Sequence, residues 1–167
     1  MHHHQHLAAQ VKQFLNSALA GSSIQPDKLL ATQIRCWGFP EFDPANRAEY
    51  QGFFNYLIDV FAQRQWTIEP LLTSDSQVLV RFRISGYHHE EFMGLPATGA
   101  YLEFSSHILF RIREGLIDES WMYKKSLRMT TKKGSVFEFV PDAALIGNRL
   151  PRVQSACHRQ GNAASGY

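Results

Sequence analysis

Cysteine is scarce in this sequence, which holds only Cys36 and Cys157 among its 167 residues. Two cysteines so far apart do not form the dense disulfide framework of a small secreted domain, so we expect two free thiols. No run of 18 apolar residues occurs, which excludes a transmembrane helix. Residues 1–6 lack Lys and Arg, and no apolar segment follows them, so they do not predict a signal peptide. We therefore expect a cytoplasmic protein.

Charged residues are also few, at 19% of the sequence, and they are distributed unevenly. Residues 1–123 carry 9 Lys and Arg against 13 Asp and Glu, a net charge of −4. Residues 124–167 carry 8 against 2, a net charge of +6. A basic extension of this kind can contact nucleic acid or anionic lipid, but it is more often simply solvated. Neither a nucleic-acid partner nor a membrane partner is expected.

Motifs for the common cofactors are missing. The sequence has no Gly-Lys-Ser/Thr loop for nucleotides, no Cys-x-x-Cys pair for zinc and no Gly-x-Ser-x-Gly serine elbow. The histidines at positions 2, 3, 4 and 6 look like a short affinity tag or a native His-rich start, and they have no second ligand cluster. We expect no metal and no cofactor.

The first third of the sequence has helical periodicity. Apolar residues recur at spacings of three and four over residues 7–20 and again over 46–61, which predicts two helices. A short helix carrying Leu29, Leu30 and Ile34 is predicted between them. The glycine and prolines of residues 38–44 predict a loop.

The periodicity then changes to two, which is typical of half-buried strands. Strands are predicted over 66–72, 78–89, 102–112 and 116–125, with a hairpin turn at 114–115 and a loop over 90–99. Residues 136–140 predict a further short strand, and we expect only partial order after residue 141. Helices followed by an antiparallel meander predict an α+β fold, in which a curved, cone-shaped sheet packs on three N-terminal helices and encloses an apolar cavity.

Two segments carry a resemblance to a known family. Residues 86–99 read GYHHEEFMGLPATG, and residues 110–121, after LEFS at 102–105, read FRIREGLIDESW. Together they resemble the SnoaL-like polyketide cyclase (ester cyclase) family of the nuclear-transport-factor-2-like superfamily. The resemblance spans residues 7–127, which leaves residues 1–6 as a His-rich start and 128–167 as a basic C-terminal extension.

The resemblance implies a cone-shaped α+β fold that usually forms a homodimer through the outer face of its sheet. It also implies cofactor-free closure of a polyketide ring by an intramolecular aldol reaction. Such a reaction needs a base to remove a proton next to a carbonyl and an acid to protonate the new alkoxide.

The sequence departs from this family at two positions. Ile108 stands where family catalysts commonly have a histidine, and Met122 stands where they have the acid–base aspartate. Neither side chain can transfer a proton. His88 matches the family histidine and lies in phase with the inward positions of its strand, so it is the candidate catalytic residue. The alternative is a structural histidine at a strand end, hydrogen-bonded to backbone or to a loop carboxylate such as Glu91.

The resemblance and the strand phase also suggest which residues line the cavity and which face outward. His107 and Trp121 fall on the opposite face of the sheet and are the expected dimer contacts. The expected substrate-binding residues are Trp37, Tyr56, Phe82, Phe104, Ser106, Ile108, Phe110, Ser120 and Met122.

Three functional hypotheses follow. The first is a cyclase or isomerase that acts on a hydrophobic, polyketide-like small molecule. The second is a ligand-binding protein that kept the cavity and lost the acid–base pair. The third is a dimeric interaction protein whose basic extension contacts a partner. The fold alone cannot choose among them, because function depends on the site.

Overall fold

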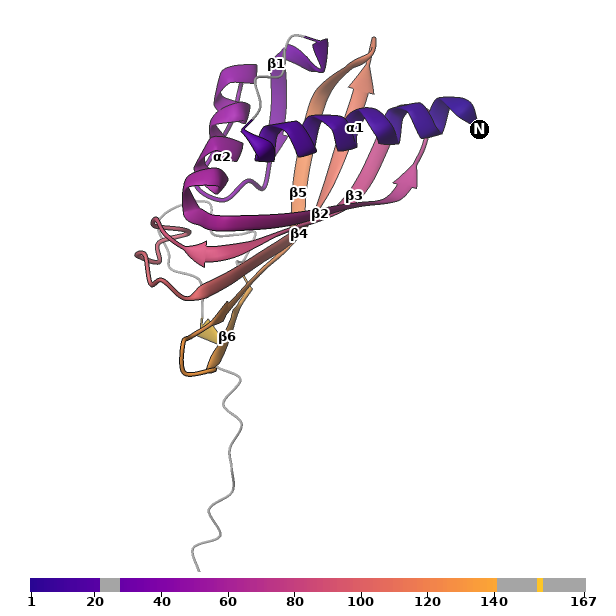
Figure 1. Cartoon of the computed structure of the whole chain (residues 1–167). Helices are drawn as coiled ribbons and strands as arrows, with labels where there is room; N and C mark the ends of the chain where they lie inside the picture. Colours follow the sequence, from indigo (N-terminus) through magenta and orange to yellow (C-terminus); the bar gives the residue numbers. More distant parts are fainter. Residues whose placement is uncertain (22–27, 141–152, 155–167) are drawn as a thin grey trace, which may run out of the picture.

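Two helices pack against the concave face of a strongly curved sheet (Figure 1). The computed structural model describes residues 1–21, 28–140 and 153–154. Within these ranges the helices are α1, His2–Ala20, and α2, Arg47–Val60. The strands are β1 Leu30–Trp37, β2 Phe61–Thr73, β3 Gln77–His88, β4 Tyr101–Arg113, β5 Leu116–Thr130, β6 Val136–Phe139 and β7 Val153–Gln154. The predicted α+β class is confirmed.

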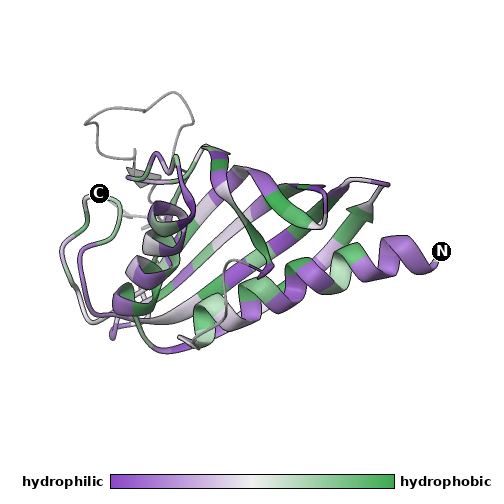
Figure 2. Ribbon diagram, turned by 90° about the horizontal axis from the view of Figure 1, so that it is seen from above, coloured by the Kyte–Doolittle hydropathy of each residue, from purple (hydrophilic) through white to green (hydrophobic). Residues whose placement is uncertain are grey.

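The sheet is mixed rather than purely antiparallel. Strands β2 to β7 pair in chain order as an antiparallel meander, while β1 pairs with β5 in the parallel direction. Polar and apolar residues alternate along the strands, as expected for a sheet with one buried face (Figure 2).

The predicted second helix is wrong, because its residues form β1. Leu30 and Ile34 are spaced by four and therefore mimic a helical stripe. In the structure, however, buried Ile34 and Cys36 alternate with exposed Arg35 and Trp37, which is the period of a strand. Pairing with β5 accounts for this outcome, since tertiary hydrogen bonds override a weak local preference.

Three other boundaries differ from the prediction. Helix α1 begins at His2, so the His-rich start is the first turn of this helix. Strand β2 follows α2 directly at Phe61 instead of starting at residue 66. Strand β5 continues to Thr130, whereas the prediction ended it at residue 125. The expectation about order after residue 141 falls on residues outside the described ranges, apart from β7.

Helix α2 begins at an N-cap that its sequence specifies. The Asn46 side chain accepts a hydrogen bond from the Glu49 backbone N–H at 3.0 Å. The Glu49 carboxylate in turn accepts from the Ala45 N–H at 2.7 Å. This reciprocal arrangement satisfies N–H groups that have no partner inside a helix and favours a negative charge in the first turn.

A close backbone approach explains the glycine at position 86 on β3. Strand β2 bulges between Ala62 and Gln65, and Gln63 has a φ of 52°. A Cβ atom on Gly86 would lie 2.6 Å from the Ala62 carbonyl oxygen and 3.2 Å from the Phe61 Cβ. Glycine at this position therefore allows β2 to bend around the end of α2 while staying paired with β3.

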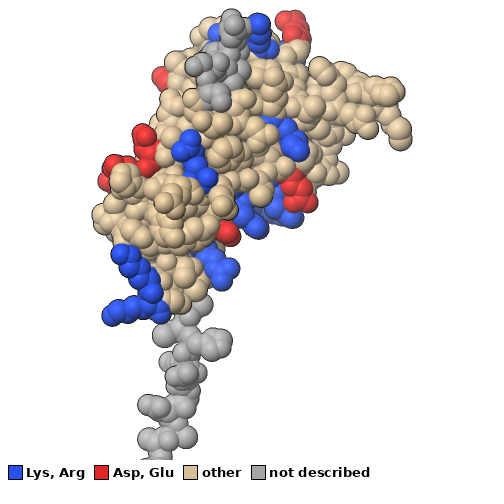
Figure 3. All heavy atoms as spheres, in the orientation of Figure 1, with Lys and Arg blue, Asp and Glu red and all other residues tan. Residues whose placement is uncertain are grey.

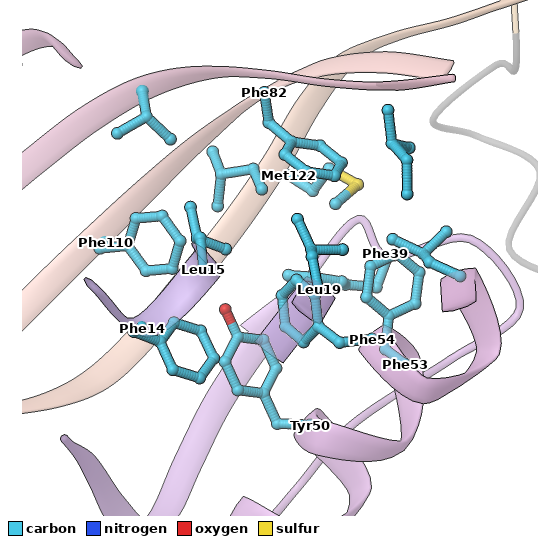
Figure 4. Packing of buried hydrophobic residues seen from close by; sticks show 14 of the residues in the cluster. Phe14, Leu15, Leu19, Phe39, Tyr50, Phe53, Phe54, Phe82, Phe110 and Met122 are labelled. Carbon is cyan, nitrogen blue, oxygen red and sulfur yellow. The ribbon is translucent and has the colours of Figure 1, made fainter. Parts of the chain in front are cut away.

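The core fills the concave side of the sheet. Phe14 of α1 and Tyr50, Phe53 and Phe54 of α2 meet in edge-to-face and stacked contacts with ring centroids 5.2–5.6 Å apart (Figure 4). The sheet side is supplied by residues such as Phe82, Phe110 and Met122. Neither described helix is long and apolar enough to cross a membrane.

Candidate active site

The inner face of the sheet is where most of the predicted lining residues lie. All seven of those on β3, β4 and β5 are buried, with no more than 3% of their surface exposed. They are Phe82, Phe104, Ser106, Ile108, Phe110, Ser120 and Met122. The structure thus places them on one apolar face, packed against the two helices. Ile108 and Met122 are directly paired neighbours on β4 and β5.

Much of the interior is occupied by aromatic side chains. Leu19, Phe53 and Phe54 of the helices lie opposite Phe82 and Met122 of the sheet (Figure 4). A pocket of about 260 Å³ lies elsewhere, beside α1, and is lined by residues including Gln10, Leu29 and Gly115. None of the predicted site residues lines this pocket.

His88 ends β3 and is buried, with 1% of its surface exposed. Its Nδ1 atom lies 3.0 Å from the Thr98 hydroxyl oxygen, and its Nε2 atom has no hydrogen-bond partner among the described residues. The Thr98 hydroxyl donates to the Met129 sulfur, so Nδ1 is assigned as the donor and Nε2 keeps its lone pair. The carboxylate partner considered for His88, Glu91, is replaced by this threonine.

Burial sets the protonation of His88. Desolvation lowers the pKa of the imidazole from 6.5, while the backbone of Glu90 acts in the opposite direction. At pH 7 the ring is therefore mainly neutral, which is the form that can accept a proton.

The loop of residues 89–100 folds back onto the end of β3, where His88 exchanges backbone hydrogen bonds with Gly99 and Ala100. Phe92 is fully buried and inserts its ring between Phe61 and Phe104, with centroid distances of 5.6 and 5.4 Å. The Tyr56 hydroxyl lies 3.0 Å from the Glu91 carbonyl oxygen and 2.7 Å from the Glu41 carboxylate. Tyr56, a predicted substrate contact, thus connects two loops; burial, followed by the Glu41 contact, raises its pKa.

Ser120 is engaged by a protein group rather than free for a ligand. The Tyr50 hydroxyl donates to the Ser120 Oγ at 3.0 Å, and both side chains are completely buried. Burial raises the Tyr50 pKa well above its usual value, so the phenol stays protonated and remains a donor. This pair satisfies two polar groups inside an otherwise apolar core.

Trp37, another predicted substrate contact, lies on the outer face. Its ring stacks on Trp121 with centroids 4.8 Å apart, and 44% of its surface is exposed. The Arg35 guanidinium lies over the Trp37 ring, 5.9 Å from its centroid. His107 and Tyr123 lie on the same face, with ring centroids 6.4 Å apart. Trp37 therefore belongs with His107 and Trp121 on the outer face and does not contact the interior.

A buried carboxylate on this outer face was missed by sequence reasoning. Glu119 is 3% exposed and forms ion pairs with Arg35 of β1 and Arg111 of β4. Arg111 also binds Asp118 through two hydrogen bonds of 2.9 and 3.0 Å, which lowers the Asp118 pKa. These contacts join β1, β4 and β5. Charges of both signs are interspersed on the face shown in Figure 3.

Lys125 is a second residue that sequence reasoning missed. Strand β5 bulges between Tyr123 and Ser126, and Lys124 has a φ of 52°. The bulge reverses the alternation, so Lys124 is exposed and Lys125 turns to the buried face, where it is 8% exposed. Its ammonium donates to the Gly38 carbonyl oxygen at 2.6 Å, and burial lowers its pKa. Two adjacent lysines in the sequence gave no signal of which one points inward.

Within the described ranges, no group of three or more His, Cys, Asp or Glu side chains is arranged to hold a metal ion. Cys36 is a free, buried thiol whose pKa is raised to about 12 by burial and by Asp43. Cys157 lies outside the described residues.

Comparison with known proteins gives a consistent result. The sequence matches the family of SnoaL-like polyketide cyclases over residues 10–131. Comparison with curated proteins gives no match.

Solved structures share the fold at low sequence identity. A protein from Jannaschia sp. CCS1, classed among the SnoaL-like polyketide cyclases, superimposes with a TM-score of 0.59 at 16% identity, covering 69% of this chain and 82% of its own. IdmH from Streptomyces antibioticus, classed as a polyketide cyclase, gives 0.56 at 23% identity, covering 69% and 88%. A Xanthomonas campestris pv. campestris protein of the same class gives 0.59 at 19%, covering 72% and 91%. Identities this low establish the shared fold alone.

Proposed function

Because this chain belongs to the SnoaL-like polyketide cyclase family, we propose that it is a cofactor-free cyclase or isomerase of a hydrophobic, polyketide-like small molecule. The observation that carries the proposal is the state of His88. The imidazole is buried and neutral, and Thr98 holds it through Nδ1. Its Nε2 has no partner among the described residues, so the lone pair of this nitrogen is available to accept a proton, as a general base requires.

The chemistry requires one proton to move out and back. The His88 Nε2 would take a proton from the carbon next to a substrate carbonyl, and the resulting enolate would attack a second carbonyl carbon to form the ring bond. The new alkoxide would then recover the proton from the imidazolium. Burial favours the return step, because desolvation destabilises the charged ring.

Substrate access to His88 depends on the loop of residues 89–100. Phe92 of this loop packs between Phe61 and Phe104, so opening the loop would withdraw this ring from the core. The hydroxyl of Tyr56 fastens the loop at Glu91. We therefore propose that this loop opens during the catalytic cycle.

The experiment compares two adjacent histidines. The purified protein would be incubated with aromatic β-keto esters that carry an uncyclised side chain, and ring closure followed by absorbance and chromatography. We expect His88→Ala to lower turnover at least tenfold. The matched control is His89→Ala, since His89 is exposed and next in sequence. Equal turnover in wild type and His88→Ala would remove His88 from the mechanism.

A second function, a non-catalytic ligand-binding or dimeric interaction protein, is favoured by a specific observation. Ile108 and Met122 occupy the paired inner positions where the family's proton-transferring residues would be expected, and both are buried in the apolar core. This alternative predicts that hydrophobic ligands bind but are not converted, and that neither histidine variant changes the absence of turnover.

We also propose a homodimer formed through the outer face of the sheet. Trp37, His107, Trp121 and Tyr123 place an aromatic cluster there, beside the ion pairs of Glu119. Aromatic side chains of this kind are common interface anchors. Light scattering at micromolar concentration should give twice the mass of one chain. The Trp37→Glu variant should have a lower mass in solution, closer to that of a single chain. Leu72→Glu, at an exposed site at the end of β2, is the control. A monomeric wild-type mass would refute the dimer.

A further inference from the structure

The inner face of the sheet holds a buried lysine that forms no ion pair with a carboxylate of the described residues. Lys125 is 8% exposed, and among the ion pairs of the described residues none includes its ammonium. Its one hydrogen bond, of 2.6 Å, goes to the Gly38 carbonyl oxygen. An ammonium has three N–H donors, so two remain free. Burying a cation without a counter-charge is unfavourable, and an anionic ligand at this position would relieve that penalty.

A second polar group lies on the neighbouring strand β4. Ser106 of β4 faces the β5 bulge, because its neighbours Ser105 and His107 pair with Ser126 and Tyr123. Ser106 is 1% exposed, and within the part of the chain that the structure describes its Oγ has no hydrogen-bond partner. A buried hydroxyl without a partner is rare in folded proteins and indicates a group that a ligand can satisfy.

The surroundings of this pair are apolar and aromatic. Phe82 lies opposite Ser106 on β3, and Met122 precedes the bulge on the same inner face. Gly38 completes the site: a Cβ there would lie 2.1 Å from the Met122 carbonyl oxygen and 3.6 Å from the Lys125 Nζ. With a φ of 78°, Gly38 lets the backbone of the segment after β1 descend onto β5 and present its carbonyl to the amine.

We propose that Lys125 and Ser106 form a binding site for the carboxylate of an aromatic or polycyclic ligand. The ammonium supplies the charge, the Ser106 hydroxyl supplies a second donor, and the phenylalanines of the inner face contact the apolar body. Lys125 retains a small exposed surface. The burial that lowers the Lys125 pKa also strengthens its attraction to an anion.

This site is separate from the candidate base. Phe82, the strand neighbour of Ser106, precedes His88 by six residues along β3, which corresponds to about 20 Å at 3.3 Å per residue. An elongated substrate could therefore place its acid group at Lys125 and its reacting carbons near His88. The carboxylate site does not require the proposed catalysis, so the two can be tested independently.

The test uses 2-naphthoate and its uncharged methyl ester, titrated into the full-length protein at pH 7.5 by calorimetry. We expect the carboxylate to bind at least tenfold more tightly than the ester, which corresponds to about 1.4 kcal/mol. Lys125→Met should abolish this preference, and Ser106→Ala should reduce it. Lys124→Met is the matched control, since it removes an adjacent lysine that is exposed, and it should leave the preference unchanged.

A measurement on the wild-type protein guards against variants that fail to fold. With ¹³C-labelled lysine, the ε-methylene resonance of Lys125 should move on addition of 2-naphthoate, while that of Lys124 should not. Failure of 2-naphthoate to bind, equal affinity for acid and ester, or a preference that survives in Lys125→Met would overturn the proposal. His88→Ala should bind like wild type, so loss of turnover in that variant leaves the carboxylate site standing.

Discussion

Replacing Tyr50 with phenylalanine removes a hydroxyl whose partner is then left alone in the core. The Tyr50 oxygen points toward the sheet in Figure 4, where it donates to Ser120. Leaving a buried hydroxyl without a partner lowers the free energy of unfolding by about 1–3 kcal/mol. The same range applies to Ser120→Ala, which leaves the Tyr50 hydroxyl without its acceptor. The double variant removes both groups, so its cost should be smaller than the sum of the two single changes, by about 1 kcal/mol or more.

Urea denaturation followed by circular dichroism measures these free energies. We expect each single variant to lower the free energy of unfolding at an unchanged m-value, and to lower Tm by about 2–4 °C for each kcal/mol. The matched control is the cross-strand pair Ser105 and Ser126, whose hydroxyls lie 2.7 Å apart at an exposed site. That cycle should give a coupling below about 0.5 kcal/mol. Strictly additive costs for Tyr50 and Ser120 would show that the interior is hydrated, and Ser120 would again be a candidate ligand contact.

Two further predictions concern a backbone contact and a titration. Gly86→Ala should destabilise the fold by about 2 kcal/mol or more in thermal melts, because its Cβ would lie 2.6 Å from the Ala62 carbonyl oxygen. The control is Gly52→Ala in α2, where a Cβ would have nothing within 4 Å, and this change should be neutral or stabilising. Equal effects of the two substitutions would contradict this account. His88 has a lowered pKa in the folded state, so its contribution to stability should be complete above pH 6.5 and decline as the pH falls from 6.5 toward the folded pKa. His88→Gln should flatten that part of the stability profile measured by urea titration, and an unaltered slope would count against the burial of the ring.

Periodicity predicted the elements whose burial is one-sided. The alternation in residues 102–112 gave β4 nearly to its ends, and the apolar stripe of residues 46–61 gave α2. It failed at β1, where a spacing of four between Leu30 and Ile34 fits a strand as well as a helix. The pairing of β1 with β5 also shifts register between Leu30 and Arg35. A register shift of this kind is set by the partner strand, which the local sequence does not contain.

The candidate site was likewise predicted where local strand phase determines it, and missed where contacts with distant segments determine it. The inner positions from Phe82 to Met122 followed from strand phase, as did the burial of His88. The positions of Lys125 and Trp37 did not follow from strand phase. A bulge in β5 turns Lys125 inward, and the parallel pairing of β1 with β5 places Trp37 on the outer face. Thr98 could not be recognised as the partner of His88, because that contact depends on how the loop after β3 folds back.

The parallel pairing of β1 with β5 also bears on the order in which the chain folds. Strands β2 to β5 are joined by short turns and one loop, so each pairs with its neighbour in sequence. Strand β1 instead meets residues more than 80 positions later, such as Trp121 opposite Trp37. Because closing so long a loop is entropically expensive, we expect the meander to form first and β1 to dock last. Gly38 follows β1 directly, so the amine of Lys125 gains its carbonyl partner only in that final step.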